Sequence, residues 1–511
     1  MLKKRGLYFL SLILSFGVIL TGCTQKESKK PVNLKFTIAH TNDIHGRINY
    51  NEENKSIGFS KISAYLSKLR SEKSNVWLVD SGDMLHGQPV VTVSKGKTAV
   101  EAMNILGYNY FTPGNHDFNY GYQRLVELSK DMKCKVLAAN ITLPDGSLLF
   151  KANDMIEIDG AKIGIFGLAT PETKVKTNPK NVEGLTFKDP VETAKEQVSL
   201  LKKNGADGVI AIAHLGTDDE SKGHNSYDVR DNNKEIDLIL DGHSHSDMSK
   251  IQQMEGKAKI MSGGAYLENL VVVDFNIENG VKSIDLKNLS FDDFSSEGSD
   301  SNVDSLLEKI NEENAPILGK VIGHTDIDLN GKKSAVRTSE TNLTKLVTTA
   351  IKNETGADIV FINGGSFRDS IHAGDITMGH VISVSPFGNY IITKSLKGKD
   401  IIDILELGFS EYPAASARFP QVAGLQCTLD SSAPAGSRVK SLMVGGVSVE
   451  KGKEYIVATN DFLAAGGDGY EAFKSWEEIG QFSAVDEIFS SYLPRISPIR
   501  EDGFPACITV I

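Results

Sequence analysis

Between residues 34 and 289, short apolar runs alternate with amphipathic helical stretches, and this alternation constrains the fold more than any other feature of the chain. The apolar runs predict eight buried strands, at residues 36–39, 76–79, 108–112, 135–138, 163–167, 208–213, 236–240 and 270–275. Helices are predicted between them, for example at residues 59–70, 98–106, 122–130 and 191–203. Strands and helices that alternate in this way predict an α/β fold built in layers.

A polar segment ends this region and marks a domain boundary. Residues 295–302 read Ser-Ser-Glu-Gly-Ser-Asp-Ser-Asn, which is typical of a flexible connection, and a helical stretch at residues 303–311 follows. A second α/β region begins near Gly319, with predicted elements at 343–352, 359–362 and 455–459. Because 511 residues are too many for one core, the length predicts two to four domains, and this boundary favours two. Their predicted bounds are 34–290 and 317–511, joined by a linker and connector helix at 291–316.

The N-terminus resembles a bacterial lipoprotein signal. Basic residues at 3–5 precede an apolar run over residues 7–20, about 14 residues long, whereas a bilayer-spanning helix needs about 20. The sequence Leu-Thr-Gly-Cys that ends at Cys23 resembles the lipobox, in which the cysteine becomes lipidated after cleavage. We expect a signal peptide over 1–22, a tether over 23–33, and an extracytoplasmic protein anchored to the cell membrane. The alternative is an ordinary signal peptide followed by an incidental cysteine.

Charge and cysteine content exclude two classes of function. Without its signal peptide the chain has 52 basic and 66 acidic residues, a net charge of −14, which argues against binding nucleic acid polymers. Small anionic substrates remain possible, since a metal site supplies local positive charge. The other cysteines, Cys134, Cys427 and Cys507, lack C-x-x-C spacing, so buried free thiols are expected rather than a zinc finger or a disulfide framework.

Five short polar motifs each follow the end of a predicted strand. They are Asp43-Ile44-His45, Ser81-Gly82-Asp83, Gly114-Asn115-His116-Asp117, His214 and Gly242-His243-Ser244-His245. Ligands bind at the carboxyl ends of strands in open α/β sheets, so these five segments can converge on one place. Asp, His and Asn suit divalent Zn, Mn, Fe or Co. Two such ions that share a carboxylate activate water for attack on phosphorus and neutralise the phosphoryl charge.

Each motif taken alone has an ordinary structural explanation. The Asp-x-His sequence is usually a surface loop, Asp83 is a plausible turn residue, and His214 is a plausible buried histidine at a strand end. Chance does not readily place all five motifs in this order at five strand ends. The sequence therefore predicts a metal site.

The order of the motifs resembles that of the calcineurin-like metallophosphoesterases. Over residues 34–490 the chain is similar to the bacterial family of 5′-nucleotidases and 2′,3′-cyclic-nucleotide phosphodiesterases. The resemblance implies that the first domain is a four-layer α/β-β-α metallophosphoesterase sandwich and that the second is an α/β nucleotide-recognition domain. It also implies an active site between them that releases phosphate from nucleoside 5′-monophosphates. Cyclic nucleotides and nucleotide sugars are further candidate substrates.

The resemblance implies two sets of metal ligands that share Asp83. The first set is Asp43, His45 and His245, and the second set is Asn115, His214 and His243. Some 5′-nucleotidases carry Gln at the position of His245. The two expected ions are divalent, with Zn or Mn favoured over Fe or Co.

His116 matches the catalytic histidine of the family, which stabilises the phosphoryl transition state or assists the leaving group. Some members place an Asp three residues later, where this chain has Asn119. An asparagine can orient an imidazole, but it cannot favour the imidazolium as a carboxylate does. The variant resembles the cyclic-nucleotide branch, so 2′,3′-cyclic-nucleotide phosphodiesterase activity remains an alternative main activity.

The second region contains matches to the substrate-binding residues of the family. The resemblance assigns phosphate contact to arginines, base stacking to two aromatic rings, and ribose contact to a carboxylate. The matching residues are Arg337, Asn363, Arg368, Phe387, Asn389, Phe462 and Asp468. Without the resemblance, Phe387 and Phe462 would be interpreted as core residues and Arg337 as a surface charge.

Two other classes of function compete with a nucleotide phosphohydrolase. One is a non-catalytic lipoprotein that binds nucleotides or metals, but such proteins normally lose metal ligands or the catalytic histidine, and here all are present. The other is an enzyme of the same fold that acts on an ester other than a phosphate ester. The matches to base-stacking residues argue against it.

Overall fold

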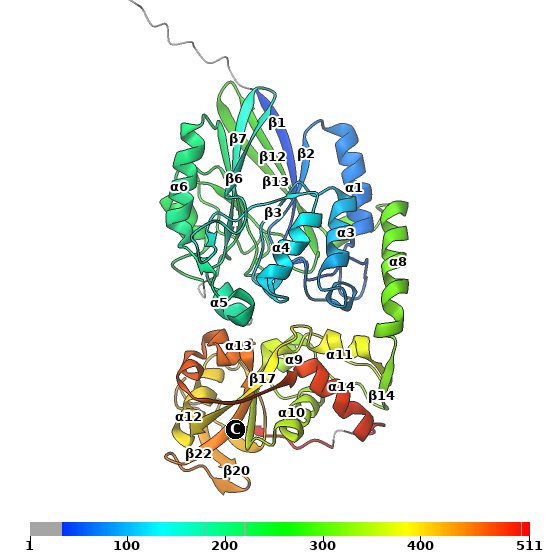
Figure 1. Ribbon diagram of the computed structural model, residues 1–511, viewed down its shortest axis with the longest axis vertical. Helices are drawn as coiled ribbons and strands as arrows, with labels where there is room; N and C mark the ends of the chain where they lie inside the picture. Colours follow the sequence, from blue (N-terminus) through cyan, green and yellow to red (C-terminus); the bar gives the residue numbers. More distant parts are fainter. Residues whose placement is uncertain (1–32, 178, 219–220, 502) are drawn as a thin grey trace, which may run out of the picture.

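The computed structural model describes residues 33–177, 179–218, 221–501 and 503–511. The expected signal peptide, Cys23 and the tether up to residue 32 lie outside the described residues. Within the described ranges, no helix is both long and apolar enough to cross a membrane. Figure 1 shows two α/β domains placed end to end, with α8 beside them.

Two sheets form the centre of the first domain. The strand order of the larger sheet is β13-β12-β1-β2-β3-β4, with bounds Val281–Ser290, Asn269–Glu278, Leu34–Thr41, Val76–Asp80, Tyr110–Phe111 and Lys135–Val136. The order of the other sheet is β11-β10-β9-β7-β6, with bounds Lys259–Met261, Leu238–Leu240, Gly208–His214, Ala161–Ala169 and Asn153–Ile158. Strands β1 to β4 are parallel, as are β7, β9, β10 and β11, so their carboxyl ends share one edge of each sheet. A short pair, β5 (Ile141–Thr142) and β8 (Thr186–Phe187), lies apart from both sheets.

Helices cover the outer face of each sheet, which makes four layers. Apolar side chains such as Phe36, Ile163 and Ile210 fill the space between the sheets. The larger sheet is covered by α1 (Phe59–Glu72), α3 (Lys97–Leu106) and α4 (Tyr122–Asp131), and the other by α6 (Pro190–Lys203) and α7 (Ser226–Asn232). The predicted four-layer α/β architecture is confirmed.

Local sequence explains where these helices begin. In α6, the Asp189 carboxylate caps the helix by accepting a hydrogen bond of 2.8 Å from the backbone N–H of Glu192, and Pro190 occupies the first turn. Buried Val198 and Leu201 then hold one face of α6 against the sheet.

The second domain is built on a five-stranded sheet. Its order is β18-β15-β22-β17-β23, with bounds Pro420–Ala423, Ile359–Asn363, Glu454–Asn460, Tyr390–Lys397 and Glu478–Ala484. One face is covered by α10 (Asn342–Thr355) and α14 (Val485–Ile496), and the other by α12 (Gly398–Gly408). A smaller sheet packs beside α12, in the order β21-β20-β19-β24, with bounds Val447–Ser448, Val439–Val444, Leu425–Leu429 and Ile508–Val510.

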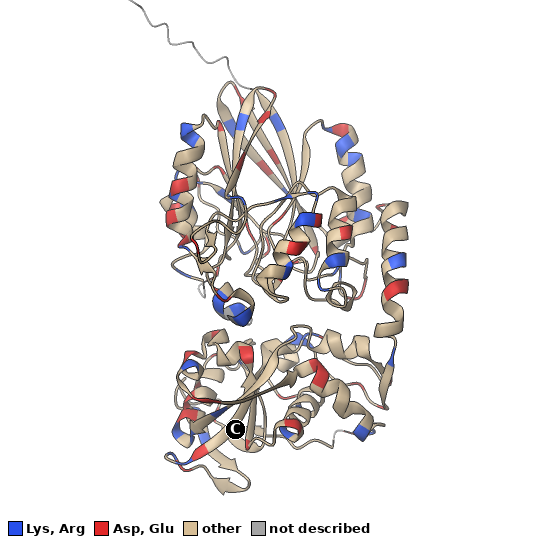
Figure 2. Ribbon diagram, viewed as in Figure 1, with Lys and Arg blue, Asp and Glu red and all other residues tan. Residues whose placement is uncertain are grey.

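Short elements complete the second domain and the boundary between the domains. Strands β14 (Val321–Thr325) and β16 (Gly374–Thr377) pair with each other. The short helices are α2 (Pro89–Thr92) and α5 (Thr173–Lys176) in the first domain, and α9 (Lys333–Val336), α11 (Met378–Val384) and α13 (Asp461–Ala464) in the second. Figure 2 shows basic residues of α5 at the edge of the first domain that faces the second, while both signs of charge occur on α1, α6 and α8.

Helix α8 (Ser301–Leu318) carries the chain from the first domain to β14. The helix is longer than the predicted stretch 303–311, and it continues past the expected limit at residue 316, with Pro316 inside its last turn. Val303, Leu307 and Ile310 are buried in the core of the first domain. Most of α8 is therefore fixed to the first domain.

Candidate active site

The five predicted motifs meet at the carboxyl ends of β1, β2, β3, β9 and β10. Backbone hydrogen bonds link the loops, since the N–H of Asp43 donates to Gly82 O over 2.9 Å and the N–H of His45 donates to Asp83 O over 2.8 Å. The imidazole Nδ1 of His214 lies 2.6 Å from Ser81 O. The convergence expected from strand order is therefore present.

The first expected ligand set forms a compact group. One ligand atom each from Asp43, His45 and His245 lies within 4.8 Å of the other two, and the same holds for Asp43, Asp83 and His214. The Nε2 atoms of His45 and His245 are 3.1 Å apart. All five side chains are buried except that of His245, which is partly exposed.

The second expected ligand set adjoins the first through Asp83. Asn115 Oδ1 lies 2.9 Å from His243 Nδ1 and 3.2 Å from His214 Nε2. Asp83 Oδ2 lies 3.5 Å from His214 Nε2 and 3.8 Å from His45 Nε2. Asp83 thus stands between the two sets, where a shared ligand must lie.

Two glycines allow the loops to approach so closely. A Cβ atom on Gly114 would lie 2.3 Å from Asp83 Oδ1, and one on Gly82 would lie 2.3 Å from the backbone nitrogen of Gly114. Gly82 also has φ of +93°, which L-residues with side chains rarely adopt. Any larger residue at either position would force the ligand loops apart.

The expected ligands have an unusual backbone conformation. Five of them have positive φ, namely Asp43 (51°), His45 (50°), Asp83 (58°), His243 (85°) and His245 (54°). Such backbone costs on the order of 1–3 kcal/mol at each residue and persists only where the surroundings impose it. Its concentration in these loops is typical of a functional site.

Asp117 holds two of the loops together. Its carboxylate accepts backbone hydrogen bonds from Asp83 (2.8 Å), Met84 (3.0 Å), Leu85 (2.8 Å) and Gly114 (2.7 Å). In the sequence this carboxylate is visible only as the last residue of the Gly-Asn-His-Asp motif, which predicts no role for it. Its position next to His116 was the available signal.

Burial and the neighbouring charges together set the charge states in this cluster. Burial, opposed by His214 and reinforced by Asp83, raises the pKa of Asp43 to about 7. Burial lowers the pKa values of His45 and His245 well below the usual range, so both imidazoles are neutral at pH 7. Burial opposes a charge on His214, but the neighbouring Asp83 carboxylate raises its pKa to about 10, so His214 carries a proton that a bound cation would displace. Metal ligation requires neutral imidazole and ionised carboxylate. By residue type, the donor set of two buried carboxylates, four histidines and one amide oxygen fits two divalent cations.

His116 and Asn119 form a hydrogen-bonded pair. Asn119 Nδ2 lies 3.2 Å from His116 Nδ1, and the Thr177 hydroxyl donates to Asn119 Oδ1 over 2.7 Å. Because an amide NH₂ only donates, this network assigns the imidazole proton of His116 to Nε2. Burial lowers the pKa of His116 to about 4, despite the opposing effect of Asp83. His116 is therefore a neutral donor at its outer nitrogen.

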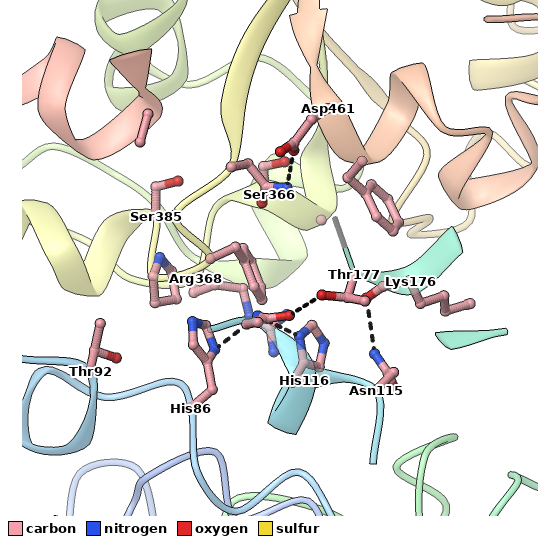
Figure 3. A pocket seen from close by; sticks show the side chains of 18 of the residues that line it. His86, Thr92, Asn115, His116, Lys176, Thr177, Ser366, Arg368, Ser385 and Asp461 are labelled. Carbon is pink, nitrogen blue, oxygen red and sulfur yellow. Dashed lines mark hydrogen bonds between the residues drawn. The ribbon is translucent and has the colours of Figure 1, made fainter. Parts of the chain in front are cut away.

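His86 joins this pair, although it lies in none of the predicted motifs. Its Nδ1 lies 3.3 Å from Asn119 Nδ2, and its ring stacks on those of His116 and Phe387 with centroids 6.0 Å apart in both cases. The only signal was a histidine three residues after Asp83, outside any motif of the family. Figure 3 shows His86 and His116 side by side in the pocket wall.

A cavity of about 470 Å³ lies between the two domains. The first domain contributes Asp83, Asn115, His116, Asn119, His243 and His245, and Asp43, His45 and His214 are buried. All seven residues expected to bind substrate line the cavity from the second domain: Arg337, Asn363, Arg368, Phe387, Asn389, Phe462 and Asp468. Figure 3 shows side chains of both domains directed into this space.

Hydrogen bonds fix several of the second-domain residues. Asn363 Nδ2 donates to Asp468 Oδ2 over 2.6 Å, and Asn389 Nδ2 donates to Asp461 Oδ1 over 2.6 Å. Phe387 and Phe462 are half-buried, so each presents part of its ring to the cavity.

Arg368 connects the two domains. Its Nη2 donates to the hydroxyl of Tyr266, which belongs to the first domain, and its Cζ lies 5.2 Å from the ring centroid of Phe387. The Tyr266 ring is also 5.5 Å from His45 and 5.4 Å from His245 between centroids. The guanidinium is thus held beside the first ligand set.

Comparisons with known proteins agree with this geometry. The family model described as calcineurin-like phosphoesterase matches residues 36–247, and that described as 5′-nucleotidase, C-terminal domain matches residues 321–475. The trifunctional nucleotide phosphoesterase protein YfkN of Bacillus subtilis is 30% identical over 90% of this chain, which spans only 34% of that relative's length. The 5′-nucleotidase of Vibrio cholerae is 29% identical, with 98% of each chain covered. A 5′-nucleotidase precursor structure from Thermus thermophilus has a TM-score of 0.76 and 26% identity, covering 94% of this chain and 99% of that one.

The two matched regions divide the site between them. The first contains every expected metal ligand, and the second contains every expected substrate-binding residue. Both occur in one chain, in the order found in relatives that align over nearly its whole length. The chain belongs to the family of metal-dependent phosphoester hydrolases that join a calcineurin-like phosphoesterase domain to a 5′-nucleotidase C-terminal domain.

Proposed function

We propose that this protein is an extracytoplasmic, lipid-anchored hydrolase that uses two divalent metal ions to release phosphate from nucleoside 5′-monophosphates. The observation that carries the proposal is the composition of one cavity. Its first-domain wall contains His116 and four of the seven expected ligands, and its second-domain wall contains two arginines, two half-buried phenylalanines and a carboxylate. The first-domain wall suits a phosphate group, and the second-domain wall suits a nucleoside.

The two ligand sets would hold one ion each, with Asp83 common to both. When bound, the ions supply positive charge to the phosphoryl oxygens and activate water for attack on phosphorus. Hydrolysis breaks the bond from phosphorus to the ribose 5′ oxygen, which then needs a proton. His116 is neutral and carries its proton on Nε2 through the network of Asn119, so it is placed to donate a hydrogen bond to that oxygen as negative charge develops there, while water supplies the proton.

The second domain positions the substrate in this account. Arg337 and Arg368 offer guanidinium groups that match the geometry of phosphate oxygens. Phe387 and Phe462 stack on the base, which tolerates different bases because each has a π-face. Asp468 accepts a hydrogen bond from ribose. Such contacts hold the phosphorus atom in the orientation that attack by water requires, which lowers the entropic part of the barrier.

A second candidate function is hydrolysis of 2′,3′-cyclic nucleotides. Asn119 favours it, because the residue gives His116 an amide donor where some members of the family have a carboxylate. The purified protein can be assayed with 5′-AMP and with 2′,3′-cyclic AMP, and chromatography separates the products. The larger kcat/KM shows which activity is the main one. The proposal expects 5′-AMP to be the better substrate, and a preference for the cyclic substrate supports the second candidate.

Replacing Phe462 by alanine is expected to raise KM for 5′-AMP by about 5- to 150-fold. This range corresponds to the 1–3 kcal/mol that stacking on a base contributes. Hydrolysis of an aryl phosphate, which lacks base and ribose, is expected to change much less. Phe462 is a cleaner test than Phe387, because the Phe387 ring also contacts His116, with centroids 5.2 Å apart.

Phe482→Ala is the matched control for this experiment. Phe482 is a half-buried ring of β23 that packs against the core of the second domain instead of lining the cavity. The control is expected to lower the melting temperature without a selective effect on 5′-AMP. Parallel losses on both substrates in Phe462→Ala would contradict the stacking role.

The location of the protein is tested through its lipid. Labelled fatty acid is expected to enter the wild-type protein in a lipidation-competent bacterium, and Cys23→Ala is expected to abolish the label. Gel autoradiography measures the incorporation. Cys134→Ala, which changes a buried thiol, is the control and keeps the label. Unlabelled wild-type protein in the culture medium would contradict the anchor.

A further inference from the structure

Glu172 contacts a proposed metal ligand from behind. It lies between β7 and α5, and its Oε2 is 2.8 Å from His243 Nε2. The other ring nitrogen of His243, Nδ1, lies 2.9 Å from Asn115 Oδ1 and so faces the second ligand set. The two nitrogens of this imidazole therefore have different partners, a carboxylate on one side and the ligand cluster on the other.

This arrangement selects one tautomer of His243. An ionised carboxylate can only accept a hydrogen bond, so the proton of the neutral imidazole must be on Nε2. The lone pair of Nδ1 then points to the ligand cluster and is free to bind a cation. A carboxylate that fixes a ligating histidine in this way sets its ring orientation and increases its basicity.

Two basic side chains flank the Glu172 carboxylate. Lys176 Nζ lies 3.7 Å from Oε2, and His224 Nε2 lies 3.5 Å from Oε1. The Glu172 side chain is only 11% exposed, so solvent weakens these interactions little.

The same short segment also orients the second ligand of the set. Asn115 Nδ2 donates to the backbone carbonyl of Lys176 over 3.1 Å. The amide nitrogen is thereby turned outward, and Oδ1 is turned toward His214 and His243. Residues 172 and 176 thus orient His243 and Asn115. These are two of the three residues in the second ligand set.

We propose that Glu172 is a positioning residue for the second metal ion, which it serves by holding His243 in the Nε2-protonated tautomer with Nδ1 directed at the ion. The inference rests on the proposed two-metal function. Glu172 touches neither substrate nor ion in this account and acts only through His243. Its loss should therefore affect one of the two metal affinities and leave the other intact.

The test is a titration of the metal-free protein with Zn²⁺ against a chromophoric chelator, which yields two stepwise dissociation constants. Glu172→Ala is expected to weaken one constant by about 10- to 100-fold, the usual effect of removing such a partner, and to leave the other unchanged. Glu172→Gln keeps the shape and a carbonyl acceptor but loses the charge, so a smaller weakening of the same constant is expected. Glu183→Gln, at an exposed position in the same region, is the matched control and should bind as wild type.

Melting temperatures of the metal-free proteins separate positioning from a structural role. Positioning predicts that Glu172→Gln melts at the wild-type temperature without metal and gains less stability than wild type when Zn²⁺ is added. Equal weakening of both constants with a lower metal-free melting temperature in both variants would overturn the inference, as would wild-type constants in Glu172→Ala. A wild-type protein that binds fewer than two ions contradicts the proposed function itself, which is a separate result.

Discussion

Asp83→Ala is expected to lose both metal ions and to fall to background in phosphate release. Asp83 Oδ2 lies between His45 of the first ligand set and His214 of the second, at 3.8 Å and 3.5 Å. Removing its side chain takes one ligand from each ion. Asp43 then remains as the only carboxylate among the expected ligands. Metal content by atomic emission and phosphate release from 5′-AMP measure the two losses.

Two further variants make this result interpretable. Asp83→Asn keeps the volume of the side chain but removes its charge, so it should also lose metal and thereby exclude a cavity as the cause. Asp145→Ala changes an exposed loop carboxylate of the same domain and should keep both ions and full activity. Two bound ions and full turnover in Asp83→Ala would remove Asp83 from the role of shared ligand.

His116→Ala is expected to keep both ions while losing about 10²–10³ in kcat for 5′-AMP, the usual cost of removing one hydrogen-bond donor from a developing negative charge. Its side chain is in no ligand set, and its Nδ1 is engaged by Asn119. The loss corresponds to about 3–4 kcal/mol of transition-state stabilisation. Steady-state kinetics together with metal analysis separate this effect from that of Asp83→Ala.

His372→Ala is the control, since that histidine is exposed on the second domain. It is expected to match wild type in both kcat and metal content. If His116→Ala instead loses metal, the residue is a ligand and its assignment as hydrogen-bond donor is wrong. Activity within a few fold of wild type would exclude it from the chemistry altogether.

The sequence predicted the strands that are buried on both faces. Strands β7 and β9 lie inside the sandwich, so nearly every residue is apolar and the runs are visible without periodicity. Strand β13 was missed, because it is an edge strand whose exposed and half-buried residues alternate and it carries Lys282, Asp285 and Lys287. An edge strand that buries only one of its faces contains no continuous apolar run, so its sequence does not reveal it as a strand.

The metal ligands could be predicted for a different reason. Each lies in a short motif directly after a strand, so strand order alone brings the motifs to one edge. Glu172 and His86 have no such motif, and each acquires its partner from a loop distant in sequence. The 2.8 Å contact between Glu172 and His243 spans 71 positions along the chain. Positive φ at His243 and His245 likewise depends on how the loops pack, which no local pattern encodes.

The central claim is that two ions held by one cluster hydrolyse a nucleotide in the cavity between the domains. The most direct measurement is phosphate release from 5′-AMP by the purified, chelator-treated protein as Zn²⁺ or Mn²⁺ is added stepwise, with bound metal counted at each step. The account predicts no release by the metal-free protein and full activity only as occupancy approaches two ions per chain. Full turnover without metal, or with a single bound ion, would contradict it.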